Sequence, residues 1–166
     1  MIIQLENTRQ EILLTVGDIP EHLFNERENE QTWSVGQVLE HLHKTEVEIT
    51  KAIKYMLTLP EQEPLPDQPL KLTLDRSTKR IAPAAITPAI VVNKNDILHA
   101  LSQSRNQLLQ LIDSIPPEQD LTTRGFKHPV FPILSIKQWI EFVGYHEQRH
   151  LAQIFEIKQF ITNESV

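Results

Sequence analysis

Two histidines four residues apart, His146 and His150, are the residues of this sequence best suited to chemistry. The segment around them has the apolar pattern of a helix, and side chains four residues apart lie on the same helix face. Two imidazoles placed in this way can bind one transition-metal ion, and zinc and nickel both accept such ligands. A usable site then needs a third protein ligand from elsewhere in the chain.

His41 is the best candidate for that third ligand. With about 100° of rotation per residue, the apolar residues of 34–59 form one stripe, and His41 lies on its inner flank, whereas His43 points away. His146 and His150 lie inside the corresponding stripe of their own helix. Three imidazoles leave a coordination position open for water or substrate, as a catalytic site requires. A metal so held can lower the pKa of bound water to about 7, or stabilise a bound thiolate.

Other interpretations of these residues stay open. A histidine beside an apolar stripe can be a hydrogen-bonded core residue, although burying three unpaired imidazoles is costly. Residues 146–150 also fit the His-Glu-x-x-His pattern of zinc proteases, but residues 151–166 contain no further histidine, which disfavours a protease. Glu147 is a candidate for a catalytic role or for orienting an imidazole, although a solvated helix residue is the favoured interpretation.

Four amphipathic helices must position these histidines. Apolar periodicity and helix-ending residues predict them over 2–16, 34–59, 93–114 and 135–160. Ser34, Ser135 and either Asn93 or Asn95 are suitable capping residues, and Pro60 stops the second helix. Four such segments predict an all-α four-helix bundle, with residues 1–166 as a single domain.

Two irregular links join these helices. Residues 60–92 are rich in proline and have no sustained helical period, so we expect a long crossover that wraps the surface. It either closes a pocket or simply tethers two helices. Residues 117–134 form a second loop, in which His128 is a turn residue before Pro129 or a residue at the pocket mouth. Gln153 either forms a hydrogen bond near the site or, as favoured, packs toward a neighbouring helix. Trp33 and Trp139 are expected to fill space in the core or at helix ends.

Composition narrows the range of functions. A net charge of −6 and a pI near 5.6 disfavour binding to nucleic acid or to anionic lipid. The chain has no cysteine, so any thiol chemistry must use a thiol brought by a substrate. No apolar run is long enough to span a membrane and the N-terminus is not a signal peptide, so we expect a cytoplasmic protein.

Several segments resemble the DinB/YfiT-like superfamily of four-helix-bundle metalloproteins. Residues 33–42 resemble its Trp-Ser/Thr-x-x-x-x-x-x-His-Leu signature at the start of the second helix. Residues 145–154 resemble its His-x-x-x-His-x-x-Gln-Ile signature on the fourth helix, and His128-Pro129 and Trp139 add to the likeness. The long proline-rich crossover departs from the family pattern and leaves the substrate open.

This resemblance implies a bundle of the DinB/YfiT type with long crossover loops, often a homodimer, and a divalent metal, zinc or nickel, held by His41, His146 and His150. Members with known activity include S-transferases that use bacillithiol or mycothiol, a mycothiol-dependent isomerase and proteins described as metal-dependent hydrolases. The expected function is a metal-dependent enzyme that activates water or a low-molecular-weight thiol against a small-molecule substrate. The alternative is a non-catalytic bundle that binds a metal or another ligand.

Overall fold

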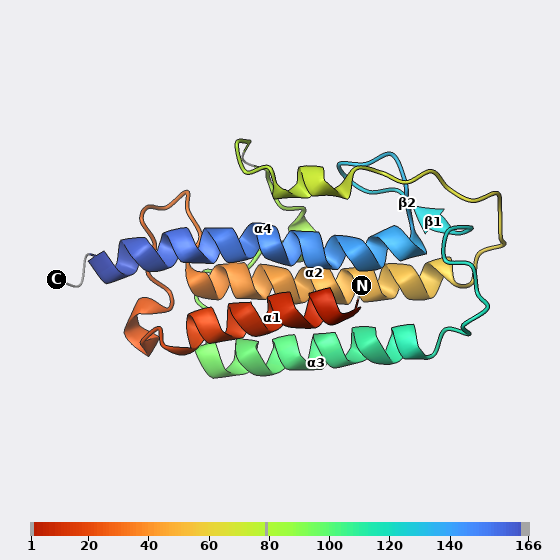
Figure 1. The fold of residues 1–166 in the computed structure, drawn as a ribbon. Coiled ribbons are helices and arrows are strands. Elements are labelled where there is room, and N and C mark those ends of the chain that lie inside the picture. Colours follow the sequence, from red (N-terminus) through yellow and green to blue (C-terminus); the bar gives the residue numbers. More distant parts are fainter. Residues whose placement is uncertain (1, 79, 164–166) are drawn as a thin grey trace.

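The computed structural model describes residues 2–78 and 80–163, which form four long helices packed side by side (Figure 1). These helices are α1 (Ile2–Gly17), α2 (Val35–Met56), α3 (Lys94–Asp113) and α4 (Ile136–Asn163). In Figure 1, α1 and α4 run in one direction, and α2 and α3 run in the other. The all-α four-helix bundle predicted from the sequence is confirmed.

The predicted capping residues begin the later three helices. Ser34 forms a reciprocal capping box with Gln37, in which each side chain bonds the other residue's backbone N–H. The Asn93 side chain accepts a hydrogen bond at the start of α3, and Ser135 Oγ accepts one from the backbone three residues later. These bonds satisfy N–H groups that have no partner within the helix. They set where α2 and α4 begin, and thus the height of the histidines along the bundle.

Two helix ends differ from prediction. The helix α2 ends at Met56 rather than at Leu59, because the chain tightens into turns just before Pro60. The helix α4 continues past Phe160 to Asn163, since no proline or glycine follows to stop it.

The crossover between α2 and α3 spans the length of the bundle because these two helices run parallel. It contains two short 3₁₀ helices, η2 (Leu70–Leu74), which packs on α4, and η3 (Ala84–Ile86), which packs on α2. A third, η1 (Glu21–Leu23), lies between α1 and α2. The crossover is irregular, as predicted. It runs along the outside of the bundle, on the side of α2 and α4, the helices that carry the three histidines (Figure 1).

A small β-ribbon before α4 was not predicted. The strands β1 (Gly125–Phe126) and β2 (Leu134–Ser135) pair antiparallel. Two residues are too few to show a strand period, so no pattern marks them in the sequence. Gly125 is required for the pairing, since a Cβ atom there would lie 2.6 Å from the carbonyl oxygen of Leu134.

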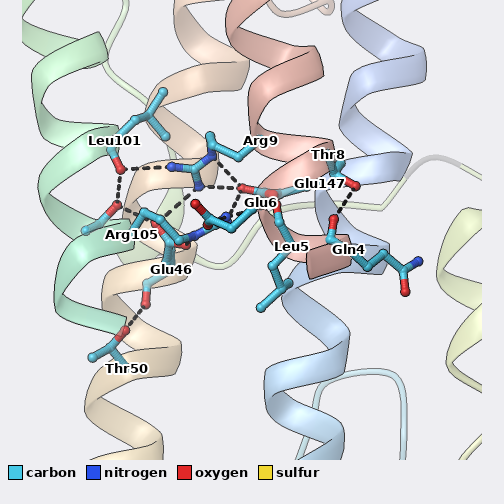
Figure 2. Close-up of polar contacts among 11 residues, drawn as sticks. Gln4, Leu5, Glu6, Thr8, Arg9, Glu46, Thr50, Leu101, Arg105 and Glu147 are labelled. Atoms are coloured by element: carbon cyan, nitrogen blue, oxygen red, sulfur yellow. Dashed lines mark hydrogen bonds and ion pairs between the residues drawn. The ribbon is translucent and has the colours of Figure 1, made fainter. Parts of the chain in front are cut away.

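The buried apolar residues form two clusters, and a polar layer lies between them. The members of the polar layer are Arg9, Glu46, Ser104, Arg105 and Glu147. Every helix contributes to it (Figure 2). On α4, Glu147 lies one turn from Val143 in one cluster and one turn from Leu151 in the other.

Ion pairs join the polar layer across the bundle. Both Arg9 Nε and Arg105 Nη2 donate to Glu147 Oε1, each over 2.8 Å. The same arginines bind Glu46, with Arg105 Nε 2.7 Å from Oε1 and Arg9 Nη2 3.1 Å from Oε2. Arg9 also donates to the backbone carbonyl of Leu101. These charged side chains are at most 6% exposed, so the bonds replace solvation lost on burial.

None of the helices in the described part of the chain combines the length and the apolarity that a bilayer crossing needs.

Candidate metal centre

The structure brings together the three histidines that the sequence singled out. His41 comes from α2, and His146 and His150 come from successive turns of α4. The Nε2 atom of His146 lies 3.2 Å from Nε2 of His41 and 3.2 Å from Nε2 of His150. One ligand atom from each ring lies within 4.8 Å of the others. This group of atoms, here called the histidine triad, could hold one metal ion; that it does so stays a prediction.

Hydrogen bonds on the outer side of two rings fix which nitrogen faces inward. His41 Nδ1 lies 2.9 Å from the carbonyl oxygen of Ile86, which can only accept, so Nδ1 carries the proton. His150 Nδ1 donates to Gln153 Oε1 over 2.8 Å. In a neutral ring the other nitrogen, Nε2, then presents a lone pair. Two lone pairs are thereby directed toward His146. Metal-bound imidazoles commonly donate their other N–H group to an oxygen in this way.

Burial keeps the rings of the triad neutral. It lowers the pKa of His150 to about 3, helped by the neighbouring His41. The pKa of His146 is held well below its ordinary value, first by burial and then by His150 and His41. Burial also lowers the pKa of His41, although the hydrogen bond to Ile86 opposes that shift. Neutral imidazole is the form that binds a metal.

This donor set fits a divalent cation. His146 Nε2 has two close neighbours that present lone pairs, and it can donate a proton to only one of them. Protonating a second ring is disfavoured by burial. A cation among the three nitrogens satisfies all of them at once, and tetrahedral ligands of zinc at about 2.1 Å would lie roughly 3.4 Å apart. The two separations from His146, 3.2 Å each, are close to that value, and the third, between His41 and His150, is within 4.8 Å.

The triad opens into a cavity of about 1000 Å³. The cavity is lined by residues of α2 and α4, by residues between 28 and 33 in the link before α2, by described residues between 73 and 87 of the crossover, and by 128–130 of the second loop. Of the two roles considered for the crossover, closing a pocket is therefore the one observed. Lys44 and Gln37 hold the crossover against α2 by donating to the carbonyl oxygens of Thr87 and Ala89.

Aromatic side chains flank the triad. The ring centroid of Trp33 lies 4.9 Å from that of His41 and 6.4 Å from that of His150. Phe142, one turn before His146, stacks on that ring at 5.5 Å. Trp33 was expected in the core or at a helix end; it precedes α2 but also lines the cavity. Trp139 is buried, as expected.

Two of the three roles considered for Glu147 are wrong, namely a solvated helix residue and a partner that orients an imidazole. Its carboxylate is 2% exposed, so it is not solvated, and it binds Arg9 and Arg105 rather than an imidazole. Nor is Glu147 among the cavity-lining residues in the described part of the chain. Adjacent residues on a helix point about 100° apart. His146 therefore faces the cavity while Glu147 faces the polar layer.

Gln153 and His128 take a larger part in the site than the sequence analysis favoured. For Gln153 the less favoured of the two roles considered, a hydrogen bond near the site, is the one observed, since its side chain accepts from His150. Its position three residues after His150, on the same helix face, was the available signal. His128 fulfils both roles considered for it: Nδ1 accepts from the backbone N–H of Val130 in the turn, and the ring lines the cavity. Burial lowers the pKa of His128 to about 4, and Arg80 adds to the shift.

Comparisons with known proteins agree with this architecture. The family described as the DinB superfamily matches residues 4–154. The chain is 35% identical over 139 residues to YuaE, an uncharacterized protein of Bacillus subtilis (strain 168), covering 83% of this chain and 85% of that protein.

Two solved structures share the fold. TT2238, described as a four-helix bundle protein, aligns with a TM-score of 0.64 at 19% identity, over 93% of this chain and 95% of its own. YfiT from Bacillus subtilis, described as a probable metal-dependent hydrolase with an unusual four-helix bundle topology, aligns with a TM-score of 0.64 at 18% identity, over 97% and 85%. At these identities the structural likeness shows the fold. The family match over most of the chain goes further, and the protein belongs to the DinB superfamily.

Proposed function

We propose that this protein is a metal-dependent enzyme that binds a divalent ion, zinc or nickel, through His41, His146 and His150 and acts on a small molecule. The observation that carries this proposal is the convergence of three Nε2 atoms at the wall of a large cavity. The description of YfiT, a protein of the same fold, as a probable metal-dependent hydrolase supports it.

When bound, the ion supplies a Lewis acid that makes water or a small thiol nucleophilic near neutral pH. The protein's own residues orient and shield that position. Ile86 and Gln153 fix the inward nitrogens of His41 and His150. Trp33 and Phe142 place apolar surface beside the triad, which limits access of bulk water and strengthens electrostatic interactions there.

The proposed nucleophile is either water or a low-molecular-weight thiol, corresponding to a hydrolase or to a thiol S-transferase. The chain itself has no cysteine, so a thiolate at this site comes from a co-substrate. A cavity of about 1000 Å³ has room for a substrate together with a small thiol.

A purely structural ion is less well supported. The polar layer already links the four helices without any metal. An ion that only braces the bundle would also need no cavity beside it, and structural zinc sites are usually closed by four protein ligands. The two roles differ in outcome: removing a bracing ion lowers the melting temperature sharply, whereas removing a catalytic one mainly abolishes turnover.

Metal analysis of untagged protein tests the proposal. We expect about one equivalent of transition metal per chain. His146→Ala should lose it while circular dichroism still shows the folded bundle, and His22→Ala, which changes an exposed histidine outside the cavity, should keep it. Hydrolase and thiol-transfer screens on the metal-loaded protein then separate the two reactions. Absence of stoichiometric metal, or metal retained by His146→Ala, would contradict the proposal.

A further inference from the structure

The cavity wall formed by the crossover and α4 is positively charged. Of the residues that the structure describes, three arginines line it, Arg76, Arg80 and Arg149, and the acidic residues lining the cavity are Glu28 and Glu156. The triad adds neutral rings, so a bound divalent ion would keep its full charge. The whole chain, by contrast, carries a net charge of −6. A positive cavity in an acidic protein attracts small anions selectively, because its low-dielectric walls focus the field.

Two of these arginines have structural partners. Arg149, beside His150 on α4, donates to the carbonyl oxygens of Thr73, Asp75 and Thr78 and so anchors the crossover. Arg76 forms an ion pair with Glu156 and also donates to the carbonyl oxygen of Arg149. Both guanidinium groups are thus held in place at the cavity wall. Glu156 compensates the charge of Arg76, whereas Arg149 donates to carbonyl oxygens and contributes a fixed positive charge.

Arg80 differs from both. Within residues 2–78 and 80–163 its side chain has no hydrogen bond and no ion pair, although it lines the same cavity. Its charge reaches the groups around it: it repels Arg149, adds to burial in lowering the pKa of His128, and attracts the exposed carboxylate of Asp75 without forming an ion pair with it. Among the described residues, Arg80 therefore has donors without a hydrogen-bond partner and a cationic neighbour, Arg149, and an anion bound between the two would relieve their repulsion.

We propose that the small molecule handled at this site carries a carboxylate or phosphate group, which Arg80 binds by charge-assisted hydrogen bonds beside the fixed charge of Arg149. The planar guanidinium matches two oxygens of either group. This assignment of a substrate class rests on the proposed function. The anionic group anchors the molecule, and the reactive end of the molecule faces the histidine triad. The anion site itself needs no metal.

The simplest alternative is that the arginines serve only to attach the crossover to α4. That role accounts for Arg149 and Arg76, whose donors are occupied by backbone and by Glu156. It does not account for Arg80, which holds no described segment in place. Arg80 is also exposed, so replacing it should not disturb folding.

The test is a titration of metal-free, full-length protein with inorganic phosphate and with acetate, followed by amide chemical shifts in NMR spectra. We expect saturable shifts around Arg80 and Ile81. Arg80→Gln should weaken both affinities on the order of tenfold, the loss expected for a hydrogen-bonded charge partner. Arg80→Lys, which keeps the charge but not the planar fork, should lie between. Lys54→Gln, which removes an exposed charge outside the cavity, should match the wild type.

Acetamide, a neutral isostere of acetate, should produce no saturable shifts. Equal affinities for wild type and Arg80→Gln, or shifts that fail to saturate with either anion, would overturn the proposal. Metal content is measured separately on the metal-loaded protein. A chain that binds metal but shows no Arg80-dependent anion binding refutes the anion site alone. A chain that binds anions through Arg80 but no metal refutes the proposed enzyme alone.

Discussion

At the scale of single residues, the hydrogen bonds at Nδ1 of His41 and His150 determine which nitrogen of each ring presents a lone pair to the triad. A proton on Nδ1 of His41 and of His150 leaves Nε2 free, and the acceptors are Ile86 O and Gln153 Oε1. Only the second acceptor belongs to a side chain. Gln153 is therefore the residue through which this control can be tested by substitution.

We predict that Gln153→Ala weakens metal binding about 10–100-fold, the range found when a supporting hydrogen bond to a metal ligand is lost. The ring of His150 would then be free to rotate or to change tautomer. Competition with a chromogenic chelator measures the affinity. Gln159→Ala, on an exposed position of α4, is the matched control and should leave the affinity unchanged. Equal affinities for the two variants would show that Gln153 does not support the site.

The sequence predicted the triad but not its supporting residues. His41, His146 and His150 could be found because each lies on the inward face of a helix whose period is visible. The placement of Glu147 failed because its partners, Arg9 and Arg105, are on other helices, and no local pattern links them. Contacts across a bundle depend on helix rotation and on side-chain rotamers, which periodicity does not specify.

At the scale of elements, the polar layer ties all four helices at one height. Removing one partner from a buried ion pair leaves the other charge uncompensated. Glu147→Ala would expose Arg9 and Arg105 to this penalty, and we predict a loss of about 3–5 kcal/mol in the free energy of unfolding. Urea denaturation measures it. Glu11→Ala, at an exposed position of α1, should change stability by less than about 0.5 kcal/mol. Similar values for both variants would refute the prediction.

Glu46 should make the stability depend on pH. Burial alone would raise the pKa of its carboxyl group, but Arg9 and Arg105 outweigh burial and hold it below the ordinary 4.5. A carboxyl with a lowered pKa in the folded state stabilises the protein above its unfolded-state pKa. That contribution is therefore present above 4.5 and is lost as pH falls from there through the lower folded pKa.

Urea denaturation between about pH 6 and pH 3 tests this expectation. The buried, neutral histidines also favour unfolding as pH falls, so the informative quantity is the difference between wild type and Glu46→Gln. That difference should favour the wild type above 4.5 and shrink below it. A difference that does not change with pH would mean that the ionisation of Glu46 contributes nothing to stability.

Helix positions were predictable where local chemistry determines them. Ser34, Asn93 and Ser135 cap the helices where their residue types suggested. The β-ribbon could not be predicted, because its pairing joins residues on either side of a loop and involves only two residues per strand. The close approach that requires Gly125 is likewise visible only in three dimensions.

At the scale of the whole molecule, the parallel arrangement of α2 and α3 makes the crossover part of the site. The sequence predicted a long crossover, but the helix directions follow only from the way the helices pack (Figure 1). The hydrogen bond from His41 to Ile86 O connects the triad to the crossover directly. A cation on Nε2 makes the Nδ1–H group a stronger donor, so metal binding should tighten this bond.

We therefore predict that hydrogen exchange in residues 84–88 slows when metal is added to the metal-free protein. Mass spectrometry of peptides from this segment measures the rate. The segment 117–122, which does not line the cavity, serves as the internal control. His146→Ala, which keeps His41 but lacks one ligand, should abolish the effect. Equal exchange with and without metal would show that the crossover does not respond to the site.

One consequence of the polar layer concerns discrimination among ions. On α4, Glu147 belongs to the polar layer and its neighbour His146 lines the cavity. The helix therefore cannot turn about its axis without separating Glu147 from Arg9 and Arg105. The rotation of α4, and with it the position of His146 and His150 along the cavity wall, is consequently set during folding, before any ion could bind. Under the proposed function, an ion whose preferred coordination does not match the histidine triad would gain little from adjustment of the helix. The choice among chemically similar metals would then depend on how firmly the surrounding helices are held.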